Sequence, residues 1–248
     1  MRPNASGGGV ADTGPYFADL SQQLMSDHDV DATVQRICDR AVEVVPAADF
    51  CGLTVRQRRG RLVTVAHTDE MALECDRLQY ELKQGPCVSS ALEDEPFLIR
   101  STGRDQRWPD WGVRVAALGV HSLISVQLSA EVLDPDRDPL GAINLYARRV
   151  DTFTAADLER AMVFAAHAGN ALATSQLVSS LTEAIESRHL IGIAQGILMT
   201  RYQLDEPQAF ETLQRYSSNS NVKLREVADQ VIQEGGLPAS YGDVVAQS

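Results

Sequence analysis

The sequence of residues 187–199 is SRHLIGIAQGILM, and its apolar positions recur at steps of three and four. This period predicts a helix with one apolar face. The positions on that face are Ile191, Ala194, Ile197 and Leu198. Gly192 and Gly196 lie inside the same helix, where each glycine costs about 1 kcal/mol relative to alanine. Because they are four residues apart, both lie on one side of the helix, where another helix or a nucleic acid can approach closely.

This stretch and the residues that follow it resemble the ANTAR domain, a bacterial RNA-binding antiterminator module. The likeness covers residues 179–234 in three segments that keep the family's order. The matching positions after the first helix are Ala209, Phe210, Leu213, Ser217, Asn221, Lys223, Leu224, Arg225, Val227 and Ala228. Two positions depart from the family pattern, since Gln195 stands where Lys is usual and Gly192 where Glu is usual. The first departure removes a cation that is expected to contact RNA.

Two further amphipathic helices are predicted after this one. Asp205 and Gln208 have the spacing of a capping box at the start of the second helix. Ser220 or Asn221 is expected to cap the third helix, and Gly235 is expected to end it. None of the three helices buries its apolar face alone, so the sequence predicts an all-α three-helix bundle.

The first part of the chain has a mixed pattern. Helical periodicity, a β-hairpin, more helices and an antiparallel pair of strands follow one another, which predicts an α+β domain with a central antiparallel sheet. This order, the GPC turn at residues 85–87 and the GAINLY segment at 141–146 resemble a GAF domain. The resemblance implies a sensor of a small molecule or of redox state, with an unknown ligand and no certain cofactor.

We therefore expect four parts: a disordered tail over residues 1–14, a GAF sensor domain over 15–175, an ANTAR domain over 176–236 and a second tail over 237–248. The chain holds no proline between Ala155 and Pro207, which predicts one long coiled-coil-like helix joining the two domains. An apolar row with coiled-coil spacing is expected to form the seam of a homodimer. Its members are Leu177, Leu181, Ala184 and Ile191.

Composition limits the possible functions. The 248 residues carry a net charge of −12, which argues against a general nucleic-acid binder because phosphate must be neutralised by Lys and Arg. No apolar run approaches the roughly 20 residues of a membrane span, and the N-terminus lacks the apolar core of a signal peptide. We expect a cytoplasmic protein with neither membrane nor DNA as a partner. The four cysteines do not have metal-site spacing.

The expected partner is RNA, bound through a local cluster, because residues 179–234 hold five basic and eight acidic groups. The candidate RNA-binding residues are Arg188, Ala194, Gln195, Gly196, Arg201, Lys223 and Arg225. Lys223 and Arg225 are two residues apart, so in a helix they would point about 200° apart. Tyr202 is an undecided candidate for stacking on a base, whereas Phe210 is expected on the core face. The ANTAR resemblance implies a target of paired RNA hairpins with six-base loops.

Together the two resemblances imply a signal-responsive transcription antitermination regulator that is not an enzyme. Two alternatives from other classes stay open. One is a dimeric protein-interaction module that has lost RNA binding, favoured by the acidic charge and by Gln195. The other is a GAF-type thiol sulfoxide reductase that uses Cys87, whose pKa a helix start would lower; a structural thiol is the competing explanation for this cysteine.

Overall fold

The computed structural model of this protein describes residues 13–24, 29–93, 95–130 and 139–237. These residues fall into two compact units, divided after Val178, and each unit is taken by itself below. The predicted tails lie outside the described residues, apart from 13, 14 and 237. In the described part of the chain, no helix combines the length and the apolar character that crossing a membrane requires.

The first unit is built on a five-stranded antiparallel sheet with the strand order β2-β1-β5-β4-β3. The strands are β1 (Phe50–Arg56), β2 (Leu62–His67), β3 (Phe97–Ile99), β4 (Ser122–Leu128) and β5 (Gly141–Ala147). The predicted hairpin is confirmed as β1 and β2, which pair antiparallel. The central strand β5 is buried along its whole length, as expected for a strand with helices on both faces.

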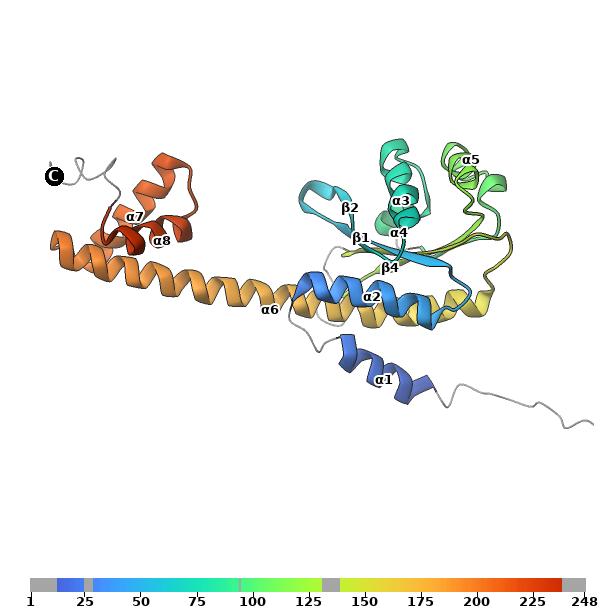
Figure 1. Ribbon diagram of the computed structural model, residues 1–248, viewed down its shortest axis with the longest axis horizontal. Helices are drawn as coiled ribbons and strands as arrows, with labels where there is room; N and C mark the ends of the chain where they lie inside the picture. Colours follow the sequence, from blue (N-terminus) through green and yellow to red (C-terminus); the bar gives the residue numbers. More distant parts are fainter. Residues whose placement is uncertain (1–12, 25–28, 94, 131–138, 238–248) are drawn as a thin grey trace, which may run out of the picture. The chain divides into compact units, whose positions relative to one another are not determined.

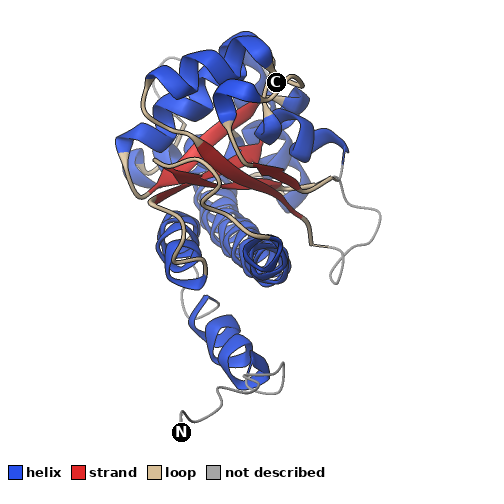
Figure 2. Cartoon of the chain, turned by 90° about the vertical axis from the view of Figure 1, so that its right-hand side faces the viewer, coloured by secondary structure: helices blue, strands red, loops and turns tan. Residues whose placement is uncertain are grey.

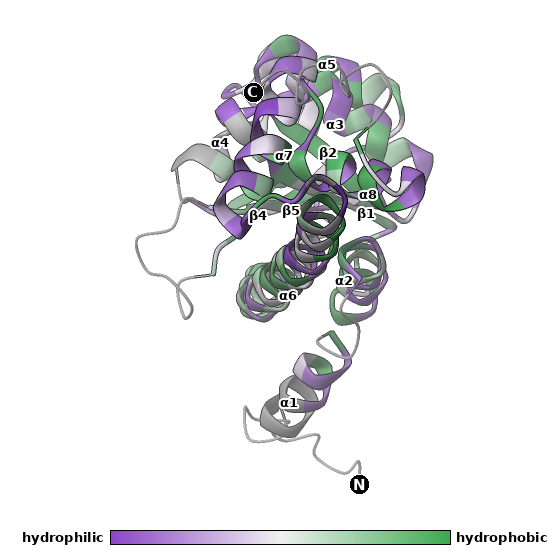
Figure 3. Cartoon of the chain, turned by 90° about the vertical axis from the view of Figure 1, so that its left-hand side faces the viewer, coloured by the Kyte–Doolittle hydropathy of each residue, from purple (hydrophilic) through white to green (hydrophobic). Residues whose placement is uncertain are grey.

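Helices cover both faces of this sheet (Figures 1 and 2). One face carries α2 (Val30–Val44) and the first part of α6 (Ala155–Tyr202), with α1 (Thr13–Leu24) packed beside them. The other face carries α3 (Glu70–Leu82), α4 (Pro86–Glu93) and α5 (Pro109–Ala117). Coloured by hydropathy, α2 and α6 show hydrophilic and hydrophobic residues side by side, as helices with one face on a core do (Figure 3).

Local capping explains where these helices begin. The Asp29 carboxylate accepts a hydrogen bond from the Asp31 amide at the start of α2. At the start of α6, the Asp157 carboxylate accepts from the Thr154 amide at 2.8 Å, and the Thr154 hydroxyl accepts from the Asp157 amide at 3.3 Å. α5 begins at Pro109, because proline is well suited to the first helical turn.

The second unit is a three-helix bundle that contains the last part of α6, α7 (Glu206–Ser220) and α8 (Leu224–Glu234). Its core is apolar. The buried members are Ala194, Leu198, Ala209, Leu213, Tyr216, Val227, Ala228, Val231 and Leu237. α6 is a single helix of 48 residues that begins in the first unit and ends in the second, as the absence of proline predicted.

The ends of α7 and α8 confirm two cap predictions and correct a third. Asp205 and Gln208 form the predicted capping box, and Gly235 ends α8 in the left-handed conformation. The predicted cap of α8 at Ser220 or Asn221 is wrong. Asn221 has a φ of 54° and ends α7 instead, because asparagine tolerates the left-handed region, and Lys223 occupies the cap position of α8.

Candidate nucleic-acid interface and a buried polar network

The glycine side of α6 is open in the bundle. A Cβ added to Gly192 or Gly196 would meet no described heavy atom within 4 Å outside its own helix neighbourhood. Gln195 lies next to them, half-buried, and its amide donates a hydrogen bond of 3.4 Å to the Glu206 carbonyl at the start of α7. Ala194, predicted as part of the RNA surface, is instead fully buried in the bundle core. Its place on the apolar stripe explains this, and the side chain does not contribute to an exposed surface.

Lys223 and Arg225 are exposed and line one shallow groove against α6. The prediction that they point in opposite directions assumed that both are helical. Lys223 instead has a ψ of 141°, an extended conformation, because it precedes the first helical residue of α8. The α6 residues that line the same groove are Ser180, Glu183, Ala184 and Ser187. Two cations therefore meet a small polar surface, with Glu183 as an acidic neighbour.

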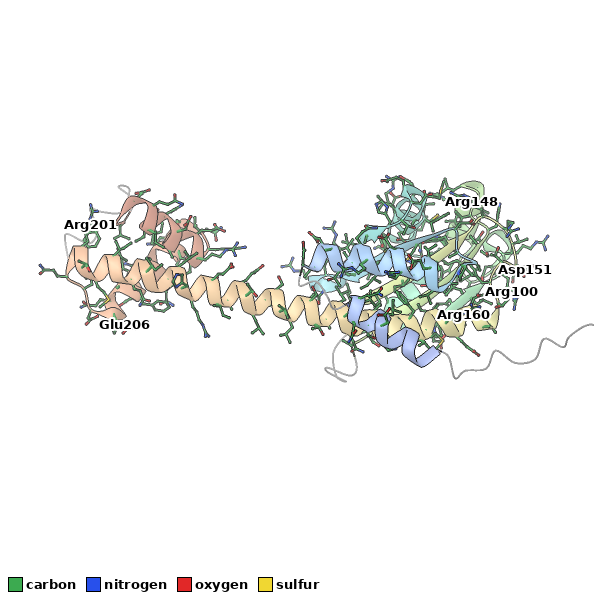
Figure 4. All side chains as sticks on the ribbon, turned by 60° about the horizontal axis from the view of Figure 1, so that its bottom comes forward. Arg100, Arg148, Asp151, Arg160, Arg201 and Glu206 are labelled. Carbon is green, nitrogen blue, oxygen red and sulfur yellow. The ribbon has the colours of Figure 1, made fainter. Side chains whose placement is uncertain are left out.

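The other two arginines have different surroundings. Arg188 is exposed on α6. Arg201, at the C-terminal end of α6 (Figure 4), donates a hydrogen bond of 2.7 Å to the Gly235 carbonyl. Its guanidinium carbon also lies 6.0 Å from the centre of the Tyr202 ring. Because a carbonyl at the end of α8 needs a donor, this contact gives Arg201 a structural role in the bundle.

An acidic groove adjoins the basic one. It lies between α6 and α8, has a volume of about 510 Å³ and shares Ser187 and Arg225 with the basic groove. Its acidic members are Glu186, Glu226 and Asp229. The charge around Arg225 is therefore mixed, which makes the surroundings of Lys223 the more favourable of the two for a phosphate.

The predicted dimer row is only partly exposed. Leu177 and Leu181 are 54% and 55% exposed, and Ala184 is exposed as well. Ile191 instead packs against the bundle core, so its proposed place in the seam is corrected. Ile185, which the sequence analysis did not select, is 68% exposed. It lies four positions after Leu181, so it extends the same stripe.

The sheet unit holds a buried carboxylate at the centre of a polar network. Asp76 on α3 is fully buried. Its Oδ1 accepts hydrogen bonds from the Tyr146 hydroxyl, from the Asn144 amide at 2.8 Å and from the Gln79 amide at 3.4 Å. Its Oδ2 accepts from the Thr64 hydroxyl at 2.9 Å. All four donors are neutral groups, so hydrogen bonds rather than an ion pair hold the carboxylate.

Two glycines make room for this network. A Cβ added to Gly52 would lie 2.6 Å from Asp76 Oδ2. A Cβ added to Gly85 would lie 2.3 Å from Gln79 Oε1, and Gly85 also has a φ of 139°. Any larger residue at either position would displace the side chain that faces it.

Burial sets the pKa values in this region. It raises the pKa of Asp76 to about 6, although the hydrogen bonds from Tyr146, Thr64 and Asn144 act in the opposite direction. Burial, followed by the nearby Asp76 carboxylate, raises the pKa of Cys87 to about 12. The expected lowering of that pKa by the helix start is therefore wrong. A buried thiol that stays protonated is a poor nucleophile, which argues against the reductase alternative.

Asp76 and Gln79 carried a signal that the sequence analysis did not use. They follow Ala72 and Cys75 at steps of four on a helix, and all four side chains are buried. Polar residues on an otherwise apolar helical face indicate a buried network. Phe210, which was expected on the core face, is half-buried and is not part of the buried core. Tyr202 accepts a hydrogen bond from the Leu237 amide.

Comparisons with known proteins agree with both units. A profile of the GAF domain matches residues 27–173, which is more than half of the chain. A profile of the ANTAR domain matches residues 179–232. The chain belongs to the GAF family and carries an ANTAR domain. Both resemblances inferred from the sequence are thereby confirmed, and both domains are of regulatory families.

One curated relative is the transcriptional regulatory protein PdtaR of Mycobacterium tuberculosis, which is matched in two strains. It is 34% identical over 61 residues, which is 25% of this GAF–ANTAR chain. The match spans about 30% of the length of PdtaR. The match therefore covers a stretch of sequence about as long as one domain.

Solved structures support the fold. The GAF domain of an Acinetobacter phosphoenolpyruvate-protein phosphotransferase has a TM-score of 0.51 at 12% identity, over 68% of this chain and 98% of that one. The bacteriophytochrome RpBphP3 from R. palustris has a TM-score of 0.56 at 8% identity, over 86% of this chain and 48% of that one. At such identities the comparison is evidence of fold alone.

Proposed function

We propose that this protein is a transcription antitermination regulator whose ANTAR domain binds RNA hairpins under the control of its GAF domain. The observation that carries the proposal is the ANTAR match over residues 179–232 together with the paired cations Lys223 and Arg225 beside α6. The bound hairpins have six-base loops in tandem. Their capture prevents a competing terminator from forming in the nascent transcript.

The basic groove is the proposed phosphate contact. Lys223 stands at the cap position of α8, where unpaired backbone N–H groups also favour an anion. Arg188 adds a third exposed cation on α6. Single-stranded loops expose bases for stacking and for hydrogen bonds to their edges, so a few correctly placed contacts serve even in an acidic domain.

The glycine side of α6 is the proposed contact with an unstacked loop base. Gly192 and Gly196 leave the helix backbone uncovered. Gln195 stands beside them and offers an amide that hydrogen-bonds a base edge but does not neutralise phosphate. Arg201 contributes through the shape of the bundle, because its guanidinium holds the end of α8.

A homodimer is part of the proposal because tandem hairpins present two equivalent sites. The stripe formed by Leu177, Leu181, Ala184 and Ile185 on α6 is apolar and exposed. Packing against a second copy would remove this surface from water, with a gain of about 25 cal/mol for each Å² of apolar area.

Titration of the full chain with a tandem six-base-loop hairpin, at several salt concentrations, tests RNA binding. Lys223→Ala and Arg225→Ala should each weaken binding by about 1–3 kcal/mol if the contact is to a base, or reduce the salt slope if it is to a phosphate. Arg215→Ala is the matched control, since Arg215 is an exposed arginine on α7 in the same bundle. Equal losses for all three variants, or no binding by the wild type, would contradict the proposal.

The acidic groove favours a second candidate, a protein partner in place of RNA. Glu186, Glu226 and Asp229 would pair with a basic segment of that partner. Glu226→Gln with Asp229→Asn separates the two functions. The double variant should tighten RNA binding by removing repulsion, whereas it should weaken the binding of a basic protein partner.

A further inference from the structure

The network around Asp76 extends from the carboxylate to the start of α4 by a chain of hydroxyl groups. Thr64 Oγ1 lies 2.7 Å from the Tyr80 hydroxyl, and Tyr80 lies 2.7 Å from Thr54 Oγ1. The Cys87 thiol lies 3.2 Å from Thr54 Oγ1. Strands β1 and β2 and helices α3 and α4 each contribute at least one member, so the chain of contacts connects two strands of the sheet with two of the helices that cover it.

An ionised Asp76 fixes the direction of every hydrogen bond in this chain. A hydroxyl carries one hydrogen, so Thr64, which donates to the carboxylate, must accept from Tyr80. Tyr80 must then accept from Thr54, and Thr54 must accept from the Cys87 thiol. All four groups therefore donate toward Asp76.

A second set of hydrogen bonds also connects Asp76 with Cys87. The Gln79 amide donates to Asp76 Oδ1 and to the Tyr146 hydroxyl, and Gln79 Oε1 accepts from the Cys87 amide at 2.8 Å. The thiol and the backbone N–H of Cys87 are thus both connected to one carboxylate. Cys87 is the second residue of α4, so both routes end where that helix begins.

The two oxygens of Asp76 differ in how easily they take a proton. Oδ1 accepts from three donors, and two of these are amide groups that cannot become acceptors without turning over. Among the described residues, Oδ2 accepts a hydrogen bond only from Thr64, whose hydroxyl rotates freely about its C–O bond. A proton on Oδ2 therefore costs the rearrangement of one hydroxyl, and it turns Asp76 from an acceptor into a donor at that position.

We propose that Asp76 Oδ2 is a proton-binding site of the GAF domain, and that a proton bound there reverses the hydroxyl chain as far as the Cys87 thiol. The protonated carboxyl donates to Thr64, Thr64 to Tyr80, Tyr80 to Thr54, and Thr54 to Cys87 Sγ. The proton comes from solvent, and no covalent bond between heavy atoms changes. The site concerns the GAF unit alone, so it stands whether or not the bundle binds RNA.

The neighbours of Asp76 support this assignment. The titratable groups that face it are Cys51 on β1, His67 on β2, Cys75 and Tyr80 on α3, Cys87 on α4 and Tyr146 on β5. Burial raises the pKa of each of these thiols and phenols, which keeps them neutral near pH 7. Asp76 is the carboxyl group of this set, and burial raises its pKa to about 6.

The experiment follows the full chain by NMR between pH 8 and pH 5, with ¹³C at the carboxyl carbon of Asp and at Cβ of Cys. We expect one titrating carboxyl signal that Asp76→Asn removes, and a shift of Cys87 ¹³Cβ with the same midpoint. His67→Gln should keep the transition and move its midpoint slightly upward, because the histidine cation lowers the pKa of Asp76. Loss of the transition in His67→Gln, or a carboxyl signal unchanged throughout, would overturn the proposal.

Thr54→Val tests the hydroxyl chain separately from the proton site. It removes the link between Tyr80 and Cys87 and leaves every hydrogen bond to Asp76 in place. The Asp76 signal should still titrate, and the Cys87 amide should still follow it through Gln79, but the Cys87 ¹³Cβ shift should be reduced to the part that passes through Asn144, which donates to Asp76 and is the other side-chain partner of Cys87. A ¹³Cβ shift of undiminished size would exclude the chain as its cause. If Asp76→Asn does not fold, Thr64→Val identifies the signal, since loss of the described partner of Oδ2 in both protonation states should move the midpoint of that signal and of no other carboxyl.

Discussion

The two units of this protein differ in where their polar side chains lie. In the GAF unit, a carboxylate, two amides and several hydroxyls are buried between the sheet and α3, and each is satisfied by another. In the ANTAR bundle, the core members in contact are apolar apart from Tyr216, and the charges lie on the surface. A change in the first network therefore alters stability and response to pH, whereas a change in the charges of the second alters binding and leaves the fold intact.

This contrast fits a division between sensing and output. A buried network has few arrangements that satisfy all its members, so one added proton or ligand shifts it as a whole. Surface cations act independently, so their effects on a nucleic acid accumulate contact by contact. The predictions below test whether the two units behave in these separate ways.

The largest effect is expected where the two units share an element. Two residues inserted after Ser180 in α6 turn everything that follows by about 200° around the helix axis. If the signal passes along α6, regulation should be lost entirely in a reporter assay, while thermal unfolding of each unit is unchanged. An insertion of seven residues, close to two full turns, is the control and should restore part of the regulation. Regulation that survives the two-residue insertion excludes transmission through this helix.

The next effect concerns the stability of the GAF unit. The pKa of Asp76 is about 6 in the folded state, against an ordinary value of 3.8. A raised pKa means that the folded state holds the proton more tightly. The contribution to stability is thus fully present below pH 3.8 and is lost as pH rises through 6. At about 1.4 kcal/mol for each pKa unit, the loss amounts to about 3 kcal/mol.

Urea unfolding at a series of pH values measures this contribution, and both tryptophans lie in the GAF unit as reporters. The unfolding free energy of the wild type, compared with that of Asp76→Asn, should fall by about 2.4 kcal/mol between pH 4 and pH 7.5, most of the full contribution. Asp105→Asn gives the opposite sign, because the hydrogen bond from Arg107 lowers the pKa of Asp105. Parallel pH curves for wild type and Asp76→Asn would show that Asp76 carries no raised pKa.

A smaller effect is expected at the exposed stripe of α6. Leu181→Asp should weaken a homodimer by about 1.5–3 kcal/mol, the value of burying one leucine side chain. Val113→Asp is the matched control, since Val113 is 63% exposed on α5 and gains the same charge. Analytical ultracentrifugation measures the dissociation constant. A wild-type protein that is monomeric at tens of micromolar would remove the dimer from the proposal.

The outcome of the sequence analysis divides along the same line as the two units. Helix caps, the hairpin and the long α6 were predictable because each depends on neighbours within a few residues, as Asp205 and Gln208 illustrate. Ala194 and Ile191 were each predicted both on the apolar face of the helix and on an exposed surface. A helical period identifies a face but does not show what covers it. Phe210 was assigned to the core by its spacing, although it lies at the margin of that face.

The network of Asp76 was beyond sequence reasoning for a different reason. Its donors at positions 64, 144 and 146 lie on β2 and β5, which the sheet order β2-β1-β5 brings together under α3. Two polar residues on the apolar side of α3, Asp76 and Gln79, were visible in the sequence, but their partners on the strands were not. The groove shared by Lys223 and Arg225 was missed because the start of α8 was misplaced.

The smallest predicted effect, and the most specific, belongs to Gln195. This position usually holds lysine in the ANTAR family, and here its amide already lies beside the open surface of Gly192 and Gly196. Gln195→Lys adds one cation, so it should tighten hairpin binding by about one phosphate contact and steepen the salt slope by about 0.7–0.9. Gln214→Lys on the exposed side of α7 adds the same charge elsewhere in the bundle and is the control. If both variants gain equally, the added cation acts through net charge alone, and the surface around Gln195 is not the site of RNA contact. Since neither change touches the buried network, the pH dependence of the GAF unit should be the same in both.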